Sequence, residues 1–154
     1  ETELHIIGDG PYRPVLERQI RVNKLQSFVY LHGGISDEAL AEAYRESDVF
    51  VLAHVTLPNG DTEGCPTVFS EAGSVGLPVI GGTGAGADTA IVEGKTGFIV
   101  DARDIDALAS KIRLLLLDSE LSREMGREGI KKVQRDHTPR VNGMRLGEFI
   151  GRYA

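Results

Sequence analysis

The sequence predicts an α/β fold, a Rossmann-like doubly wound parallel sheet covered by helices. Short apolar segments bounded by glycine, proline or aspartate alternate with segments whose apolar residues recur at helical spacing. The apolar segments are almost continuously hydrophobic, as expected of strands with helices on both faces. The chain has 154 residues, 41% of them hydrophobic, which suffices for one domain with a core. We therefore expect a single domain over residues 1–154, with a tail helix over 139–154.

Each element is predicted from its own pattern, in chain order. The expected strands are residues 4–7, 28–32, 49–53, 78–81 and 97–100. The expected helices are residues 12–23, 37–46, 66–76, 105–116, 121–135 and 140–153. Pro66 suits the first helical position, because the amide that proline lacks would have no helical partner there. Ligands of such sheets bind beyond the carboxyl ends of the strands, so the loops 8–11, 33–36, 54–65 and 81–87 are expected to form one binding site.

Composition narrows the function class. A net charge of −6 and the absence of tryptophan argue against a nucleic-acid-binding surface, which would be basic. No apolar run approaches the roughly 20 residues that span a bilayer, and the first residues do not resemble a signal peptide. Cys65 is the single cysteine, so no internal disulfide can form, and we expect a cytoplasmic protein. The four histidines and Cys65 show no metal-binding spacing, so no metal site is expected.

Two carboxylates, Glu63 and Glu71, stand eight positions apart where a loop enters a helix. The surrounding stretch from Glu46 to Gly94 contains no lysine or arginine. At about 100° per residue, Glu71 shares a helix face with Val68, Ala72 and Val75, the face expected to meet the core. A carboxylate there needs polar partners, and a polyhydroxyl ligand would supply them. The alternative is that Glu71 flanks the apolar face and reaches water, with Glu63 an ordinary loop acid.

The residues around this pair carry a family resemblance. The pattern Glu63-Gly-Cys-Pro, then Glu71-Ala, then Gly76-Leu-Pro-Val-Ile resembles the donor-binding signature of retaining glycosyltransferases of the GT-B architecture, in particular family GT4. Further segments fit in the family's order, and together they cover nearly the whole chain: residues 8–11, 28–35, 47–52, 93–100 and 125–129.

The resemblance implies a role for each matching residue. Glu63, the expected catalytic residue, would approach hydroxyls of the donor sugar, and Glu71 would bind the ribose hydroxyls. The main chain around Ile35 would meet the base. Backbone amides near the sugar and diphosphate would come from Gly64, Cys65, Thr67 and Val68. The donor would be a UDP-, GDP- or ADP-sugar, the transferred sugar would keep its anomeric configuration, and neither a cofactor nor a metal would be required.

The chain also departs from the family pattern. Family members have, before the segment that matches Leu4, a strand ending in Gly-Arg, a helix carrying a lysine, and an amino-terminal acceptor-binding domain. The resemblance implies that the absent strand lies between strands 4–7 and 49–53. We therefore expect a longer polypeptide, direct pairing of those two strands, or a strand from a self-partner. Asp88 stands one residue late for the family's glutamate.

Two other functions remain open from the sequence. One is a non-catalytic sugar-nucleotide-binding or docking module, and the other is a different GT-B enzyme, such as a sugar-nucleotide epimerase or a glycosyl phosphorylase. The run from Gly81 to Gly86 could cradle phosphate through its amides, but no lysine follows as in a P-loop. The tail helix is expected to expose Val141, Met144 and Phe149. Peripheral attachment to the inner membrane through another domain also stays open.

Overall fold

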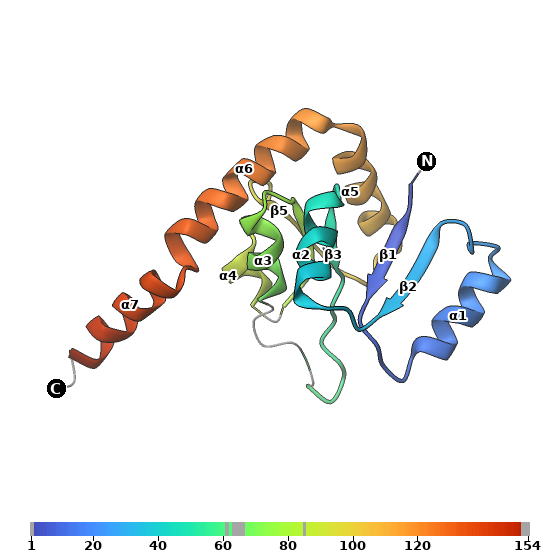
Figure 1. Cartoon of the computed structure of the whole chain (residues 1–154), viewed down its shortest axis with the longest axis horizontal. Coiled ribbons are helices and arrows are strands. Elements are labelled where there is room, and N and C mark those ends of the chain that lie inside the picture. Colours follow the sequence, from blue (N-terminus) through green and yellow to red (C-terminus); the bar gives the residue numbers. More distant parts are fainter. Residues whose placement is uncertain (1, 61, 63–66, 85, 152–154) are drawn as a thin grey trace. The chain divides into compact units, whose positions relative to one another are not determined.

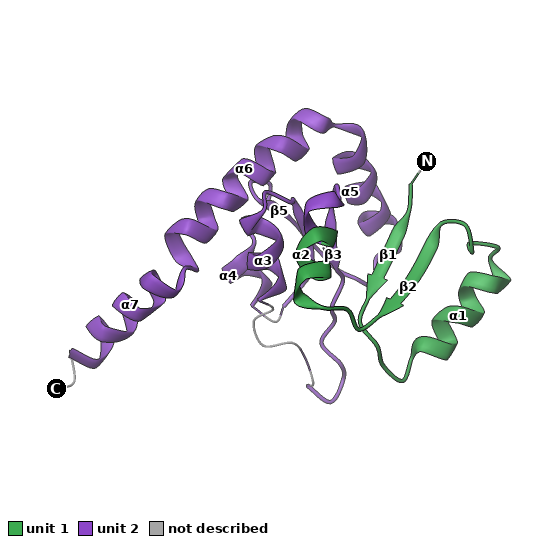
Figure 2. Cartoon of the chain, in the orientation of Figure 1, with its two compact units in different colours: residues 1–43 green, residues 44–154 purple. Residues whose placement is uncertain are grey.

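The computed structural model describes residues 2–60, 62, 67–84 and 86–151. The chain divides into two compact units, Glu1–Ala43 and Tyr44–Ala154, and each is described by itself (Figure 2). In chain order the elements are β1 (Leu4–Ile7), α1 (Arg13–Val22), β2 (Val29–Gly33), α2 (Asp37–Glu46), β3 (Phe50–Leu52), α3 (Val68–Ser74), β4 (Val79–Gly82), α4 (Ala87–Ala90), β5 (Gly97–Val100), α5 (Ile105–Leu117), α6 (Ser119–Asp136) and α7 (Pro139–Gly151) (Figure 1).

Every predicted strand and helix is present, most with bounds shifted by one or two residues. The short helix α4 was not predicted, because its four residues are too few to show a helical period. It begins after Gly86, which has a positive φ of 70° that favours glycine.

The first unit is built on a parallel pair of strands. β1 pairs with β2, with Leu4 opposite Val29. The turns after the two strands meet, because the Gly8 amide donates to the Gly33 carbonyl at 2.8 Å. Arg13, at the start of α1, donates to the Leu31 carbonyl at 3.4 Å. The two loops expected to lie together in this part of the chain, 8–11 and 33–36, do so.

The second unit holds a three-stranded parallel sheet in the order β3-β4-β5. The central strand β4 is buried along its whole length. The residues of the core cluster, which α5, α6 and the sheet contribute together, are Ile80, Phe98, Val100, Leu115 and Met125. The α/β fold class with parallel sheets is thus confirmed.

The described strands form two sheets, β1-β2 in the first unit and β3-β4-β5 in the second. Direct pairing of β1 with β3 stays a prediction. An additional strand from the same polypeptide or from a partner stays a prediction, as does the single domain.

Glycines bring α3 and α6 into close contact. A Cβ added at Gly126 would lie 2.0 Å from the Gly76 carbonyl oxygen, and one at Gly73 would lie 3.3 Å from Val133 Cγ2. Real Cβ atoms do not approach a backbone oxygen that closely, so α6 can cross the end of α3 here only with glycine at position 126. This contact gives a structural reason for the Met125–Gly129 segment of the family pattern.

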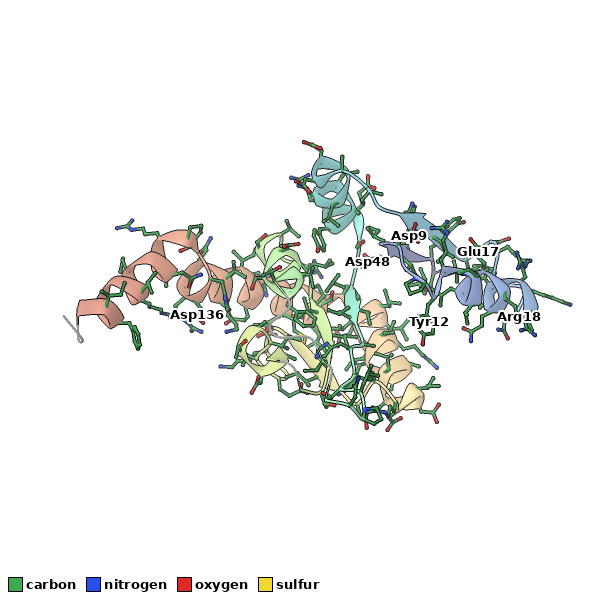
Figure 3. All side chains as sticks on the ribbon, turned by 90° about the horizontal axis from the view of Figure 1, so that it is seen from below. Asp9, Tyr12, Glu17, Arg18, Asp48 and Asp136 are labelled. Carbon is green, nitrogen blue, oxygen red and sulfur yellow. The ribbon has the colours of Figure 1, made fainter. Side chains whose placement is uncertain are left out.

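An ion-pair network lies at the junction between α6 and α7, around Asp136, which is labelled in Figure 3. Its carboxylate accepts from Arg135 at 2.7 Å, from Arg145 at 3.2 Å and from Lys132 at 3.3 Å. The Arg135 hydrogen bond is the largest cause that lowers the pKa of Asp136 well below its usual range, followed by that of Lys132. The junction therefore carries a carboxylate that is ionised at neutral pH.

The tail helix α7 differs from expectation at one residue. Met144 and Phe149 are exposed as predicted. Val141 is half-buried, so its predicted exposure is wrong. The physical reason is its place in the first turn, where its amide donates to Thr138 Oγ1 at 3.3 Å and the helix leaves α6 after two residues. No helix in the described part of the chain is long and apolar enough to cross a membrane.

The contact between α3 and α6 gives the first prediction. Gly126→Ala should lower the free energy of unfolding by about 1–3 kcal/mol, because the new methyl group overpacks a backbone contact. Gly147→Ala is the matched control, since a Cβ there meets nothing within 4 Å and helix propensity alone should raise stability by up to about 1 kcal/mol. Urea unfolding curves measure both, and equal effects of the two substitutions would contradict the close crossing.

Candidate donor-binding site

The second unit presents its loops at the carboxyl edge of its sheet. The loop after β3 leads into α3, and the glycine-rich turn after β4 leads into α4. The turn approaches the loop directly, because a Cβ at Gly82 would lie 1.9 Å from the His54 carbonyl oxygen and one at Gly84 would lie 3.4 Å from Thr56 Oγ1. The described parts of these two loops thus lie side by side, and one site formed by all four loops stays a prediction.

Helix α3 turns a different face to the core than the sequence suggested. Its buried residues are Phe69, Ala72 and Gly73, whereas Glu71 is exposed and Val75 is 39% exposed. The prediction that Glu71 lies on the core face is therefore wrong. Phe69, the largest side chain of the helix, determines the rotation of α3 about its axis. Its ring packs against the bare backbone of Gly81, where an added Cβ would lie only 2.9 Å from Phe69 Cζ.

Glu71 nevertheless has a fixed partner. The buried Tyr44, in the last turn of α2, donates from its hydroxyl to Glu71 Oε2 at 3.1 Å. Burial raises the pKa of the Tyr44 phenol well above its usual range, and the negative charge of Glu71 adds to this effect. The phenol therefore keeps its proton and remains the donor.

Aromatic packing holds Tyr44 in place. Its ring meets Phe50 edge-on at 5.7 Å between centroids, and Phe50 meets Phe69 in the same manner at 5.9 Å. Such edge-to-face pairs are favourable. The helix that carries Glu71 and the tyrosine that orients it are thus joined through one aromatic row. No local sequence pattern indicates this contact, because 27 residues separate the two partners.

The remaining predicted site residues lie in different parts of the chain. Thr67 caps α3 and accepts, through its carbonyl, the amides of Ser70 at 2.8 Å and Glu71 at 3.0 Å. Val68 is half-buried at the start of α3. Ile35 is half-buried in the first unit, before Ser36, whose hydroxyl accepts from the Ala39 amide. Outside the described residues lie Glu63, Gly64, Cys65 and Pro66.

Two residues of this edge were missed by the sequence analysis. His54, which is 9% exposed, places Nδ1 3.2 Å from the Leu52 carbonyl oxygen and Nε2 3.1 Å from that of Gly84. Arg103, after β5, donates from its guanidinium to the Thr56 carbonyl at 2.8 Å. The segment from Glu46 to Gly94 itself contains no lysine or arginine. The cation at this edge, Arg103, comes from the loop after β5 and therefore lies outside that segment.

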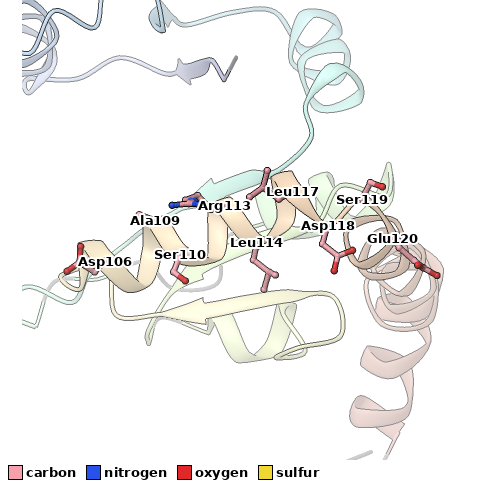
Figure 4. Close-up of a pocket in the computed structure, with 9 residues that line it drawn as sticks. All are labelled: Asp106, Ala109, Ser110, Arg113, Leu114, Leu117, Asp118, Ser119 and Glu120. Atoms are coloured by element: carbon pink, nitrogen blue, oxygen red, sulfur yellow. The ribbon is translucent and has the colours of Figure 1, made fainter.

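The described residues form a surface cavity but no group of metal ligands. Within the described ranges, no three side chains of histidine, cysteine, aspartate or glutamate gather as metal ligands. A cavity of about 900 Å³ runs along α5 to the start of α6, and Figure 4 shows its lining residues. It contains none of the predicted donor-site residues. Because the predicted chemistry lies elsewhere, we assign the site to the edge that carries Glu71.

The tyrosine-carboxylate contact gives the second prediction. Tyr44→Phe should lower the free energy of unfolding by about 1 kcal/mol, and a double-mutant cycle with Glu71→Ala should give a coupling energy of about 1 kcal/mol. Tyr30→Phe is the matched control, because its hydroxyl bonds the Ser27 carbonyl instead, and it should not couple to Glu71. A zero coupling for Tyr44 in urea unfolding would show that the bond does not hold the carboxylate.

Comparisons with known proteins show what this chain is similar to. The family described as "Glycosyl transferases group 1" matches residues 1–132. The GDP-mannose-dependent alpha-(1-6)-phosphatidylinositol monomannoside mannosyltransferase of Mycolicibacterium smegmatis is 34% identical over 151 residues, which are 97% of this chain and 40% of that protein. Sulfoquinovosyl transferase SQD2 of Arabidopsis thaliana is 33% identical over 145 residues, 92% of this chain and 26% of that protein.

Solved structures show the same fold. Sucrose-phosphate synthase from Thermosynechococcus elongatus superposes with a TM-score of 0.83 and 25% identity, over 98% of this chain and 38% of that one. Anabaena HepE in complex with UDP gives 0.84 and 21%, over 98% of this chain and 41% of that one. The chain thus spans about 40% of the length of the mannosyltransferase above. With the family resemblance confirmed along most of its length, the chain belongs to the glycosyl transferases group 1 family.

Proposed function

We propose that this chain is the donor-binding part of a retaining glycosyltransferase of carbohydrate biosynthesis, which transfers a sugar from a nucleotide sugar to an acceptor. The observation that carries the proposal is Glu71, an exposed carboxylate at the carboxyl edge of the sheet that Tyr44 holds in one orientation. Family membership supports the proposal, as do the relatives named as GDP-mannose-dependent and a HepE structure in complex with UDP-glucose.

Glu71 binds the ribose hydroxyls of the donor in this proposal. A carboxylate offers about four acceptor positions on two oxygens, and Tyr44 uses one of them on Oε2. The remaining positions accept two neighbouring hydroxyls, and hydrogen bonds to an ionised acceptor are stronger than neutral ones. The hydrogen bond from Tyr44 already restricts the carboxylate, so the side chain loses less conformational entropy when the ligand binds.

The other assignments follow the family pattern. Glu63 contacts the sugar, the main chain at Ile35 meets the base, and the amides of Gly64, Cys65, Thr67 and Val68 lie near the sugar and diphosphate. Stabilisation of the departing diphosphate is the main electrostatic task in such a transfer. We propose that the reaction requires no metal ion and no cofactor.

We propose that the acceptor is bound by another domain of the protein, which these residues do not include. Because the chain matches about 40% of the M. smegmatis mannosyltransferase, a second domain has room in proteins of this family. We further propose that both units form one domain, completed by a strand from that longer polypeptide or from a self-partner. We also propose a cytoplasmic location, where the single cysteine of this chain would stay reduced.

Ligand-induced stabilisation tests the proposal. GDP-mannose, UDP-glucose and ADP-glucose should be compared in thermal unfolding, because a ligand at 100 times its dissociation constant stabilises by about 2.7 kcal/mol. At least one of the three should raise the melting temperature, and none should do so by binding at the α5 cavity. Failure of all three at millimolar concentration would overturn the proposal.

Glu71→Gln gives the third prediction. The variant should bind the same nucleotide sugar about 1–3 kcal/mol more weakly, because it loses a charged acceptor. Glu120→Gln is the matched control, since that residue lines the α5 cavity, and its affinity should be unchanged. Isothermal titration measures both variants, and equal affinities for Glu71→Gln and the wild type would remove Glu71 from the site.

Glu63→Gln gives the fourth prediction. The variant should lose more binding affinity for the nucleotide sugar than for the corresponding nucleoside diphosphate, because the lost carboxylate is assigned to the sugar alone. The same titrations with both ligands measure this difference. Equal losses for the two ligands would show that Glu63 does not contact the sugar.

A further inference from the structure

The carboxyl edge of the first unit carries two side chains of opposite charge. Asp9 lies in the loop after β1, and Arg13 is the first residue of α1. A Cβ added at Gly33, the last residue of β2, would lie 3.4 Å from Arg13 Nη1 and 3.9 Å from Asp9 Oδ2. Both charged groups therefore lie within 4 Å of one point at the end of β2, two residues before Ile35, whose main chain is assigned to the base.

The guanidinium of Arg13 is held in place on two sides. Its Nε donates to Glu17 Oε1 at 3.1 Å, one turn further along α1, and its Nη2 donates to the Leu31 carbonyl at 3.4 Å. Among the described residues, the hydrogen bonds of this side chain use Nε and Nη2, which leaves the N–H groups of Nη1 for a ligand. The side chain is 36% exposed, so a ligand can reach it.

The carboxylate of Asp9 is fixed as well, and it is available to a ligand. Its Oδ1 accepts from the Gly10 amide at 2.8 Å. In the described part of the chain, the ion pair of Arg13 is with Glu17 and not with Asp9. Asp9 is exposed, and Figure 3 labels both carboxylates. An ionised carboxylate is an acceptor only, so this edge presents a hydrogen-bond acceptor and a hydrogen-bond donor side by side.

Guanine is the base that uses both groups most fully. Along one edge it presents the acceptors N7 and O6, followed by the donors N1–H and the 2-amino group. Arginine pairs with O6 and N7 through two N–H groups, and a carboxylate accepts from two adjacent donors through its two oxygens. Adenine and uracil offer a single amino or imino donor to the carboxylate and lack the O6 and N7 pair. Guanine therefore makes two hydrogen bonds with each group, and the other bases make fewer.

We propose that Asp9 and Arg13 select a guanine nucleotide as the donor. Arg13 donates to O6 and N7 of the base, and Asp9 accepts from N1–H and the 2-amino group. Gly33, with a φ of 70°, keeps the space beside these two groups free of a side chain. This selection rests on the proposed function, which leaves the base of the nucleotide sugar open.

Four nucleoside diphosphates separate the base from the rest of the donor. GDP, inosine diphosphate (IDP), ADP and UDP share the ribose and the diphosphate and differ in the base alone. In isothermal titration, the wild-type chain should bind GDP most tightly. IDP should bind about tenfold to a hundredfold more weakly than GDP, because its base keeps O6, N7 and N1–H but lacks the 2-amino donor to a charged acceptor.

Asp9→Asn gives the fifth prediction. The variant should lose about tenfold to a hundredfold of its affinity for GDP and less of its affinity for IDP, so that the preference for GDP over IDP largely disappears. Arg13→Gln should weaken GDP and IDP equally, because both bases keep O6 and N7, and the preference should remain. Glu3→Gln is the matched control, since this exposed carboxylate precedes the amino end of β1, and all four affinities should equal those of the wild type.

The outcomes keep this selection and the proposed function apart. Tighter binding of UDP or ADP than of GDP by the wild type, or equal binding of GDP and IDP, overturns the selection of guanine while the proposed function stands. Failure of all four ligands to bind overturns both. A preference for GDP over IDP that persists unchanged in Asp9→Asn removes Asp9 from the site. If Asp9→Asn does not fold in urea titrations, the wild-type comparison of GDP with IDP remains decisive.

Discussion

The close approach of neighbouring segments to the bare backbone of β4 determines the geometry of the site. Gly81 leaves the space that the Phe69 ring fills, and Gly82 leaves the space for the backbone of residue 54. A side chain at either glycine would push α3 or the loop after β3 away from the sheet. Because Phe69 is seated there, α3 presents Glu71 outward, where Tyr44 reaches it. The orientation of the ribose-binding carboxylate in our proposal thus depends on two residues without side chains.

The sequence predicted the elements of the fold well and the contacts of the site poorly. Hydrophobic runs locate β4 and β5, because such strands are buried on both faces and need little else for their definition. The buried face of α3 was wrong by one position, since periodicity alone does not show that Phe69 outweighs Val68. The contacts of Tyr44, His54 and Arg103 join segments 27, 30 and 47 residues apart, and a pattern read along one chain carries no information on such packing.

Charge explains how a segment rich in acids could serve an anionic donor. The stretch from Glu46 to Gly94 has no lysine or arginine. In the fold, however, the Arg103 guanidinium donates to the Thr56 carbonyl at this edge of the sheet, and the His54 ring lies between two carbonyl groups. In our proposal, backbone amides balance the diphosphate charge, while the carboxylates bind hydroxyl groups. This division of roles suits a nucleotide sugar, which has both kinds of group in one molecule.

Mapping of the bound ligand by ¹H–¹⁵N chemical-shift perturbation tests the location of the site most directly. Titration with the nucleotide sugar that stabilises the chain should shift amide signals in residues 54–60, 67–71 and 82–86. Signals along α5, including Ser110 and Leu114 of its cavity, should stay unchanged. Shifts concentrated on α5, with those of the Glu71 edge unaffected, would contradict the account.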